Sequence, residues 1–457
     1  MTPLDDRDDL DVTATITAAV HDFTPRGIAS AVRELIEGAT LPSMTRLPTV
    51  RVLAGELHVS ASTVSDAWRL LAREGIIRSA GRNGTVVLRA RGIDISDRLE
   101  RSTWTVGRHG LDLASGTPDV TLLPSIAKAL GDVDVASVAN YQVDSILPGL
   151  EDVIRESWSR ALSPDRMTIT HGAYAGVAAV LTALLRAGDR VLVENPSIPG
   201  VVDLVERHGG VPVAVTLDEH GIVPGSLSAA LATRPAALVL QPRGQNPTGV
   251  SMTWARAEEL AALLEPTRTI VIEDDHCGAV STAELTSLAR WLPDRVVRIQ
   301  SFSKSHGPDL RLAAMGAPRE VMHQMEVNRR LGGGWESMLL QRVLHELLTD
   351  PESIHAIAHA RRTYKLRHDL LAAACRSRGL QTYGSDGLNL WVRVDGEARA
   401  MRRLAQDDVG VCPGSPLTWD SPVNDHVRIT TGVMPEAQAP RVAALLAGSA
   451  AAEPRIA

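Results

Sequence analysis

Lys304 stands out because the chain almost avoids lysine. Only three of its 47 basic residues are lysine, and the others are arginine. Arginine stays protonated and forms no imine, whereas a lysine amine can lose its proton and attack a carbonyl carbon. Lys304 ends the segment Ser301-Phe302-Ser303-Lys304, directly after the β-like run 296–300. This position indicates a lysine that forms a Schiff base.

Residues with matching chemistry accompany Lys304 along the sequence. Arg311 follows it, and Asn246-Pro247-Thr248-Gly249 and Glu273-Asp274-Asp275 precede it. A Schiff-base lysine, an acid for a pyridinium nitrogen, and Ser plus Arg for a phosphate together indicate a site for pyridoxal 5′-phosphate (PLP). Taken singly, the Asn-Pro-Thr-Gly segment predicts only a turn, Asp274 a helix cap and Lys304 a surface lysine. In this order, the set predicts a PLP site.

Composition bounds the remaining possibilities. A chain of 457 residues is expected to form two or more domains, and 44% hydrophobic and 22% charged residues are typical of globular proteins. The net charge of −7 argues against nucleic-acid binding by the whole chain, although not by one basic module. Three widely spaced cysteines indicate neither a disulfide framework nor a metal site. The acidic N-terminus is not a signal peptide, and no apolar run is long enough to span a membrane, so we expect a cytoplasmic protein.

The first part of the chain predicts a small helical module. Residues 1–20 are expected to be a flexible acidic arm. Within 21–90, amphipathic patterns predict helices over 29–38, 47–57 and 64–73, the third with N-cap residues at 60–63, and the Asn83-Gly84 turn predicts a hairpin over 76–88. Three helices and a hairpin form a winged helix-turn-helix. Nine arginines against six acids make this module basic, which favours binding to DNA phosphates.

The rest of the chain has a different pattern. Residues 91–110 are polar and predict a linker. Over 111–450, short apolar runs alternate with helical stretches, which predicts an α/β domain with a large, mainly parallel sheet, helices on both faces, and a small α+β region after about residue 350. The candidate PLP residues follow the carboxyl ends of these strands, where open α/β sheets bind their ligands.

The N-terminal module resembles the GntR-type winged helix. The resemblance rests on Arg46-Leu47-Pro48-Thr49-Val50-Arg51, on Leu57 to Val64 and on Gly84-Thr85-Val86-Val87. It implies that the start of the third helix enters the major groove of an operator. The candidate DNA contacts are Arg51, Ser60, Ser62, Thr63 and Arg82, although Ser60 and Ser62 could also be simple caps and the arginines a solvated face. The family usually has arginine where this chain has Ala61.

Residues 111–445 resemble fold-type-I PLP enzymes of the aspartate aminotransferase group. The resemblance implies a phosphate site at Gly172, Ala173 and Tyr174, with further cofactor or substrate roles for other residues. It assigns Ser301 and Arg311 to the phosphate, Asn246 to the 3′-oxygen, Asp274 to the pyridinium nitrogen, Tyr141 to the neighbouring subunit's phosphate, and Arg428 to a substrate carboxylate. Asp275 competes with Asp274 because the sequence allows a slip of one residue, and Arg428 could instead pair with a neighbouring acid.

Two positions depart from that family pattern. Ile198 stands where the family usually has a tyrosine or tryptophan that stacks on the cofactor, and His276 stands where it usually has a tyrosine that binds the 3′-oxygen. Isoleucine packs on a ring but has no π surface, and histidine can be protonated. We therefore expect PLP binding without efficient transamination.

A winged helix joined to an aminotransferase-like domain is similar to the MocR-type transcription regulators. The resemblance implies a homodimer that binds operator DNA and senses an amino acid or amine through aldimine exchange at Lys304. Two alternatives remain at this point: a working aminotransferase with an accessory DNA-binding domain, and a regulator that no longer binds PLP. The changes at Ile198 and His276 argue against the first, and the retained Lys304 argues against the second.

Overall fold

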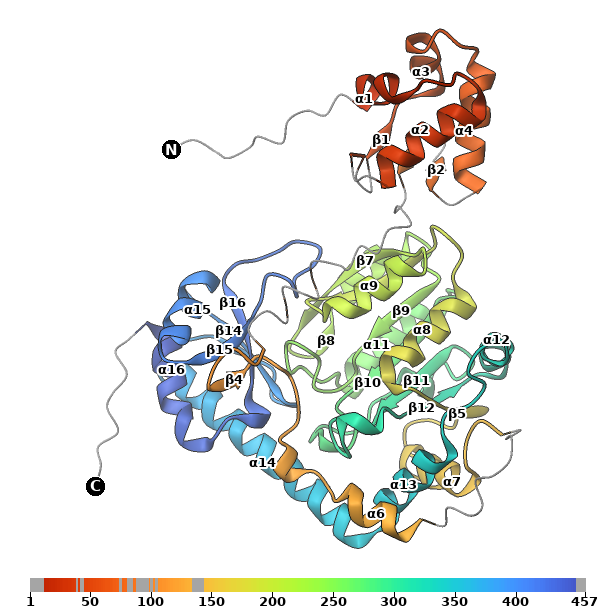
Figure 1. Cartoon of the computed structure of the whole chain (residues 1–457). Coiled ribbons are helices and arrows are strands. Elements are labelled where there is room, and N and C mark those ends of the chain that lie inside the picture. Colours follow the sequence, from red (N-terminus) through yellow and green to blue (C-terminus); the bar gives the residue numbers. More distant parts are fainter. Residues whose placement is uncertain are drawn as a thin grey trace. The chain divides into compact units, whose positions relative to one another are not determined.

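The computed structural model describes residues 12–37, 40–41, 45–73, 76–79, 85–87, 98, 102, 106–133 and 144–448. The chain forms two units, residues 1–95 and 96–457, and the division falls within the stretch 91–110. Figure 1 shows the helices and strands of both units. Two predicted site residues, Tyr141 and Arg82, lie outside the described residues.

In the described residues of the N-terminal unit, four helices accompany a three-stranded antiparallel sheet. The helices are α1 (Val12–Ala19), α2 (Pro25–Glu37), α3 (Val50–Glu56) and α4 (Ala61–Arg73), and the strands are β1 (Arg46–Leu47), β2 (Ile77–Ser79) and β3 (Thr85–Val87), in the order β1-β3-β2. Val64, Ala67 and Leu71 of α4 are buried in the core of this unit. The predicted winged helix-turn-helix is therefore present, with β2 and β3 as the wing strands.

The helices α2 and α4 begin three or four residues earlier than predicted, and two larger differences concern residues 12–19 and the second helix. Residues 12–19 form α1 and are not a flexible arm, because Ile16 and Val20 lie four residues apart and are buried in the core of the unit. The second predicted helix begins later, since Leu47 belongs to β1 and the side chain of Thr49 caps α3 by accepting from the backbone N–H of Val52.

The second unit is built on an eight-stranded sheet in the order β5-β12-β11-β10-β9-β6-β7-β8. Neighbouring strands from β11 to β7 run parallel, whereas β12 is antiparallel to both of its neighbours and β8 is antiparallel to β7. The strands are β5 (Arg166–Thr170), β6 (Arg190–Asn195), β7 (Val211–Asp218), β8 (Gly221–Ile222), β9 (Ala237–Leu240), β10 (Ile270–Asp275), β11 (Val296–Ser301) and β12 (Ala313–Ala317). The prediction of a mainly parallel sheet is confirmed.

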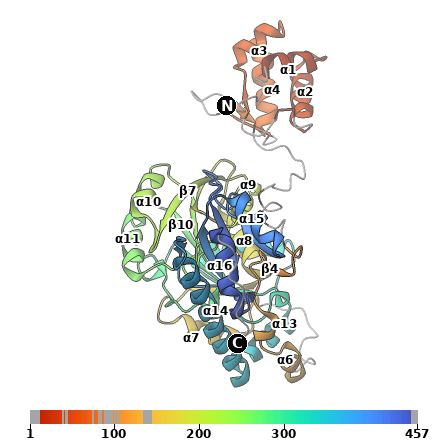
Figure 2. The ribbon, with the colours of Figure 1, turned by 90° about the vertical axis from the view of Figure 1, so that its left-hand side faces the viewer.

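Helices cover both faces of this sheet because its strands are apolar on both sides. Val191 and Val193 of β6 pack with α8 (Gly172–Leu184), α9 (Pro199–Arg207) and α12 (Arg319–Arg330), whereas Leu192, between them, packs with α10 (Pro224–Leu231) and α11 (Trp254–Leu264). Figure 2 shows α10 and α11 on one side of β7 and β10, with α8 and α9 on the other. This alternation of side chains decides which polar residues at the strand ends face α8.

A smaller region completes the unit. It contains α15 (Glu397–Gln406), α16 (Ala439–Ala447) and a five-stranded sheet, β13-β14-β16-β15-β4. The strands are β4 (Leu111–Leu113), β13 (Thr382–Tyr383), β14 (Asn389–Arg393), β15 (Val409–Pro413) and β16 (His426–Thr430). The long helix α14 (Pro351–Arg376) connects the large-sheet region to this smaller region along the chain. Three further helices of the unit precede α14 in the sequence: α6 (Ile126–Asp132), α7 (Pro148–Trp158) and α13 (Met338–Thr349) (Figure 1).

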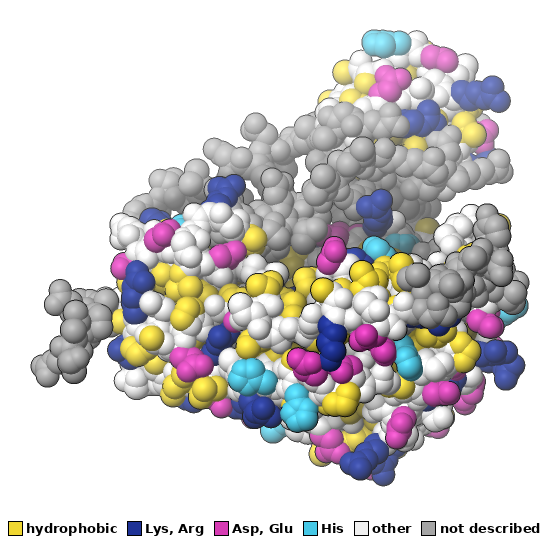
Figure 3. Space-filling view, turned by 60° about the horizontal axis from the view of Figure 1, so that its bottom comes forward, with side chains coloured by type: hydrophobic (Ala, Val, Ile, Leu, Met, Phe, Trp, Pro, Cys, Tyr) yellow, Lys and Arg dark blue, Asp and Glu magenta, His cyan; other side chains and the backbone are white. Residues whose placement is uncertain are grey.

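Two further observations concern the charges on the surface and the length of the helices. Acidic and basic side chains are interspersed on the face shown in Figure 3, unlike the single-sign basic surface that attracts nucleic acid strongly. Among the described helices, none has both the length and the apolar character that a membrane crossing requires.

Candidate functional site

The register of the large sheet gathers residues from distant parts of the sequence at one edge. Ser301, at the end of β11, pairs with Ala313 of β12, which in turn pairs with Thr170 of β5. Gly172 and Arg311 are each two residues from this row, so both lie just beyond it, at the same end of the sheet as Ser301. Asp274 of β10 is opposite Ile299 of β11. The predicted phosphate residues and the predicted acid therefore share one end of the sheet.

Asp274 has an unsatisfied carboxylate oxygen. Its side chain is 3% exposed, its Oδ2 accepts a hydrogen bond of 2.9 Å from Nε2 of Gln241, and its buried Oδ1 has no partner within the described part of the chain. Burial raises the pKa of Asp274 to about 6. An unpartnered buried oxygen costs free energy, so this one indicates a place for a proton donor supplied by a ligand.

Asp275 is fully engaged within the protein. Nη2 of Arg243 lies 2.5 Å from its Oδ2, Arg298 also bonds to Oδ2, and the backbone N–H of Gly278 donates to Oδ1 at 3.3 Å. Burial opposes its ionisation, but the charges of Arg243 and Arg298 outweigh burial and hold the pKa of Asp275 at about 2. Arg298 also lies 3.5 Å from the buried Glu273. Asp275 therefore has a structural role in a buried charge network.

Lys304 and Arg428 bind the same short stretch of backbone. Nζ of Lys304 donates to the carbonyl oxygen of Gly116, and Nη2 of Arg428 donates to that of Ala114. Burial lowers the pKa of Lys304 to about 8, and the charge of Arg428 acts in the same direction. Gly116 has φ = +67° and donates its N–H to Oγ1 of Thr430 at 2.8 Å, which fixes this turn. The amine and the guanidinium thus lie at two neighbouring points of one site.

Arg428 has no acidic partner in the described parts of the molecule. It is 7% exposed, Nη1 donates to Oδ1 of Asn246 at 3.2 Å, and its buried Nε makes no hydrogen bond to any described residue. The alternative that Arg428 pairs with a neighbouring acid has no support in this geometry. A buried guanidinium with free donors is suited to a planar anion such as a carboxylate.

The N-terminus of α8 forms the opposite side of the site. Gly172 begins the helix with φ = +77°, and a Cβ built on it would lie 2.9 Å from Nη2 of Arg311. The backbone conformation therefore favours glycine here, and the missing side chain leaves room for the guanidinium of Arg311. The free N–H groups at this helix start and the nearby Arg311 are suited to a phosphate. Oγ of Ser301 accepts from the backbone N–H of Ser303 at 3.2 Å.

Tyr174 and Ile198 lie in the region between α8 and α9. The hydroxyl of Tyr174 comes so close to Gly200 that a Cβ there would lie 2.8 Å from it, and 42% of the tyrosine surface is exposed. Ile198 precedes α9 and packs against the core on the α8 face of the sheet. An aromatic side chain is therefore present on the helix α8, but not at position 198.

His276 is held as a neutral donor to the backbone. Its Nε2 lies 2.9 Å from the carbonyl oxygen of Gly244, so Nε2 carries the hydrogen. Burial, reinforced by the charge of Lys304, lowers the pKa of His276 to about 4. The imidazole is therefore uncharged at neutral pH and its N–H is already used.

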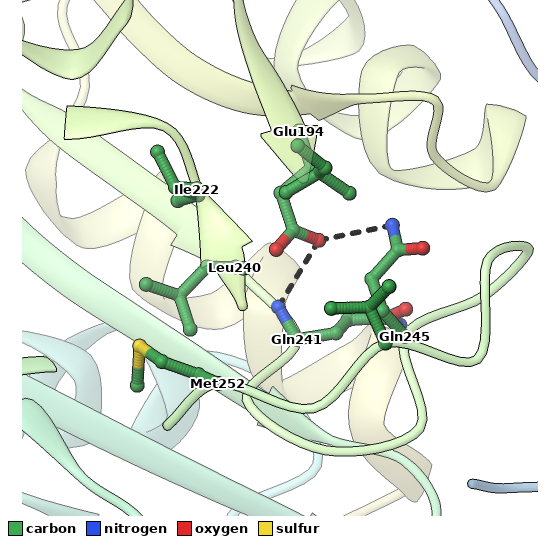
Figure 4. Close-up of a pocket in the computed structure, with 9 residues that line it drawn as sticks. Glu194, Ile222, Leu240, Gln241, Gln245 and Met252 are labelled. Atoms are coloured by element: carbon green, nitrogen blue, oxygen red, sulfur yellow. Dashed lines mark hydrogen bonds between the residues drawn. The ribbon is translucent and has the colours of Figure 1, made fainter. Parts of the chain in front are cut away.

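Three buried polar residues that the sequence analysis did not single out, Glu194, Gln241 and Gln245, form a hydrogen-bonded group that reaches Asp274 through Gln241. Oε2 of Glu194 accepts from the backbone N–H of Gln241 at 3.2 Å and from Nε2 of Gln245 at 3.1 Å (Figure 4). A cavity of about 10 Å³ adjoins them, lined mainly by apolar side chains such as Leu240 and Met252. Burial raises the pKa of Glu194 to about 8. The position of Glu194 and Gln241 at the carboxyl ends of strands could have indicated them from the sequence.

Three of the predicted DNA contacts, Ser60, Ser62 and Thr63, lie at the start of α4. Oγ of Ser60 accepts from the backbone N–H of Thr63 at 3.1 Å, and it lies 2.7 Å from the hydroxyls of both Ser62 and Thr63. Ser60 is therefore a helix cap, and the three hydroxyls form one group. Ser60, Ser62 and Arg51, which lies in the first turn of α3, are exposed.

The structure thus brings most of the predicted PLP residues to one end of the sheet, together with Arg428. Ile198 lies beside this region in the core, and Tyr141 is not described. Besides the Glu194 group, the sequence analysis missed Arg243, Arg298 and the Ala114–Gly116 turn. A basic side chain on or just after a buried strand could have indicated the two arginines.

Two family models match the chain. The model for bacterial regulatory proteins of the gntR family matches residues 24–87, and the model for aminotransferase class I and II matches residues 108–446.

Curated relatives extend over both units. The chain is 32% identical over 380 residues to the vitamin B6 salvage pathway transcriptional repressor PtsJ of Salmonella typhimurium, which covers 82% of this chain and 87% of PtsJ. It is 26% identical over 356 residues to the HTH-type pyridoxine biosynthesis transcriptional regulator PdxR of Corynebacterium glutamicum, covering 76% and 78% of the two chains. The kynurenine aminotransferase of Pyrococcus horikoshii has the same fold as the second unit, with a TM-score of 0.70 at 20% identity over 77% of this chain and 93% of that one.

Proposed function

Because the chain belongs to the bacterial regulators that join a gntR-family DNA-binding domain to an aminotransferase class I and II domain, we propose that it is a PLP-dependent transcriptional regulator. Its N-terminal unit binds an operator. Its second unit holds PLP and senses an amino compound that carries a carboxylate. Binding of the amino compound changes the affinity for the operator, because ligand binding and DNA binding are linked equilibria of the same protein.

One observation carries the proposal. Lys304 and Arg428, an amine with a lowered pKa and a guanidinium without a described acidic partner, bond to carbonyl groups two residues apart. An amino acid is complementary to both groups, since its amine can take the place of the Lys304 amine and its carboxylate can bind the Arg428 guanidinium. The ligand carboxylate would replace the carbonyl of Ala114 as the partner of Arg428.

The residues present fit PLP. The unpartnered Oδ1 of Asp274 is an acceptor for a pyridinium N–H, and the start of α8 with Arg311 is a cradle for a phosphate. Ser301 adds a hydroxyl and Asn246 an amide at the same end of the sheet, and Ala173 and Tyr174 add the N–H groups that follow Gly172. We assign these residues, with Lys304, to the cofactor. Asp275, which is saturated by Arg243 and Arg298, is not assigned to it.

When bound, PLP supplies an aldehyde that condenses with amines and a pyridine ring that withdraws electrons. Lys304 contributes the resident amine, and its lowered pKa keeps an appreciable unprotonated share near neutral pH. Asp274 keeps a proton on the ring nitrogen, and Arg428 orients the ligand by its carboxylate. These groups suffice for reversible binding of an amino compound.

Two features favour sensing over turnover. The N–H of His276 is bonded to Gly244, and its lowered pKa leaves no second proton to donate at neutral pH. Ile198 provides no ring for stacking on the cofactor. Proton transfer at the ligand carbon requires a firmly held cofactor, so we expect binding without efficient transamination.

An absorbance spectrum of the purified, PLP-treated protein tests the proposal first, because lysine-bound PLP absorbs visible light. Amino acids and the corresponding amines are then screened for a spectral change and for altered operator binding. The proposal predicts ligands that do both. Rapid, multiple-turnover conversion of an amino acid with a keto-acid acceptor would instead establish an aminotransferase.

The working unit is proposed to be a homodimer. Two helix-turn-helix units would then meet two operator half-sites, and Tyr141 would complete the site of the neighbouring subunit. Sedimentation of the PLP-bound protein at micromolar concentration tests this: a dimer is expected, and a monomer would contradict it.

A further inference from the structure

Gln241 lies on a continuous hydrogen-bonded path between Asp274 and Arg428. Its Nε2 donates to Oδ2 of Asp274 at 2.9 Å, and its Oε1 accepts from the backbone N–H of Asn246 at 2.8 Å. Oδ1 of Asn246 in turn accepts from Nη1 of Arg428 at 3.2 Å. One glutamine side chain therefore connects the acid assigned to the cofactor with the residue that holds the proposed carboxylate ligand.

The partners of Gln241 fix the orientation of its amide. A carboxylate accepts and a backbone N–H donates, so the nitrogen must face Asp274 and the oxygen must face Asn246. Gln241 is also 5% exposed, and its own N–H donates to Glu194. The side chain is thus held at both ends and at its backbone.

We propose that Gln241 is a positioning residue that couples the occupancy of Arg428 to the orientation of Asp274, and so to the ring nitrogen of PLP. This inference rests on the proposed function and adds the path by which the carboxylate end of the ligand reaches the cofactor. A ligand carboxylate that binds both Nη atoms of Arg428 replaces Ala114 at Nη2 and competes with Asn246 for Nη1. Any shift of Asn246 moves the acceptor site of Gln241, and through its amide the carboxylate of Asp274.

A double-mutant cycle in the full-length, PLP-treated protein tests this coupling. The variants are Gln241→Leu, Arg428→Gln and the double variant, and the measurements are the dissociation constant of PLP and the pH midpoint of its visible absorbance. Gln241→Leu removes a hydrogen bond to a charged group and is expected to weaken PLP binding about tenfold. The double variant should bind PLP no worse than Gln241→Leu alone. Independent, multiplying effects would overturn the proposal.

Gln241→Glu separates positioning from packing. The new carboxyl group is buried and faces the carboxylate of Asp274, so its pKa is raised. While protonated it can donate to Asp274 and accept from Asn246 as glutamine does. PLP binding should therefore approach the wild-type value at about pH 5.5 and fall at about pH 8. A loss of equal size at both pH values would indicate a merely structural role and overturn the proposal.

Two controls distinguish this inference from the proposed function. Gln381→Leu makes the same change at an exposed glutamine and should leave both measurements unchanged. A wild-type protein that stays colourless with PLP would overturn the proposed function itself. A coloured wild type whose Gln241 variants match it would overturn only the coupling.

Discussion

Asp274 and Asp275 are neighbours in sequence but face opposite sides of the central sheet. Asp274 is on the same side as Ile272, which packs in the core with α8. Asp275 is on the side of Glu273 and joins Arg243 and Arg298. The period of two along a strand therefore separates the acid that we assign to the cofactor from a structural one.

Alanine at these two positions should have different effects. Asp274→Ala should weaken PLP retention and cost less stability than Asp275→Ala, because it breaks one hydrogen bond, that from Gln241, and no ion pair. Asp275→Ala leaves two buried arginines without their shared carboxylate and should destabilise the second unit by about 3–5 kcal/mol. PLP release on dialysis and thermal unfolding measure the two effects. Equal loss of PLP with equal loss of stability would contradict the distinction.

Lys304→Ala should abolish the borohydride-dependent attachment of PLP to the chain, as detected by peptide mass spectrometry. The low lysine content supplies matched controls, since Lys128 and Lys365 lie in exposed ion pairs. Lys128→Ala and Lys365→Ala should be labelled as the wild type is. Label at another residue in Lys304→Ala would show that the assignment is wrong.

Arg428→Gln should weaken the response to amino acids at least tenfold, because a bidentate, charge-assisted contact is lost. It should change the response to the corresponding amines, which lack the carboxylate, much less. Titration of the visible absorbance with each pair of compounds gives the ratio. Equal losses for both classes would mean that Arg428 does not bind the ligand carboxylate.

Glu194→Gln should flatten the pH dependence of stability. Burial raises the pKa of Glu194 from about 4.5 to about 8, so the folded chain keeps a proton that the unfolded chain has lost. Unfolding then releases a proton, and stability falls as pH rises, by up to about 1.4 kcal/mol per pH unit, until the pH passes the folded pKa. Glutamine preserves the acceptor for Gln241 and Gln245 without titrating.

The measurement for Glu194 is the thermal midpoint of the second unit between about pH 6.5 and about pH 8. This window lies above the pKa values of Asp274 and His276 in the folded chain. The exposed Glu258 provides the control variant Glu258→Gln. Parallel pH profiles for Glu194→Gln and the wild type would contradict the prediction.

In the N-terminal unit, Arg51→Ala should weaken binding to most DNA sequences and lower the salt slope by about one unit, because a phosphate contact acts without regard to sequence. A change at Thr63 should alter base preference instead. Ser60→Ala removes the cap of α4 and should cost about 1 kcal/mol of stability. Binding to operator and unrelated DNA at several salt concentrations separates these effects.

The sequence by itself determined the two-part organisation and the mainly parallel sheet, and it singled out Lys304 as the candidate reactive lysine, because hydrophobic periodicity and a rare residue type are local signals. It also indicated Ser301, Arg311 and Asn246 by their order. It could not decide between Asp274 and Asp275, because that choice depends on which face of β10 meets α8 and which meets Arg243 and Arg298.

Only the tertiary structure decided the partners of the buried polar groups. The helix over 12–19 depends on Ile16 and Val20 finding the core of the N-terminal unit. Gln241 is near Asp274 because β9 and β10 are neighbours in the sheet, although 33 residues separate them. Whether Arg428 has an acidic neighbour likewise depends on side chains brought together by folding. Hydrogen bonds and ion pairs of this kind join segments that are distant in sequence, so the pattern of residues along the chain does not predict them.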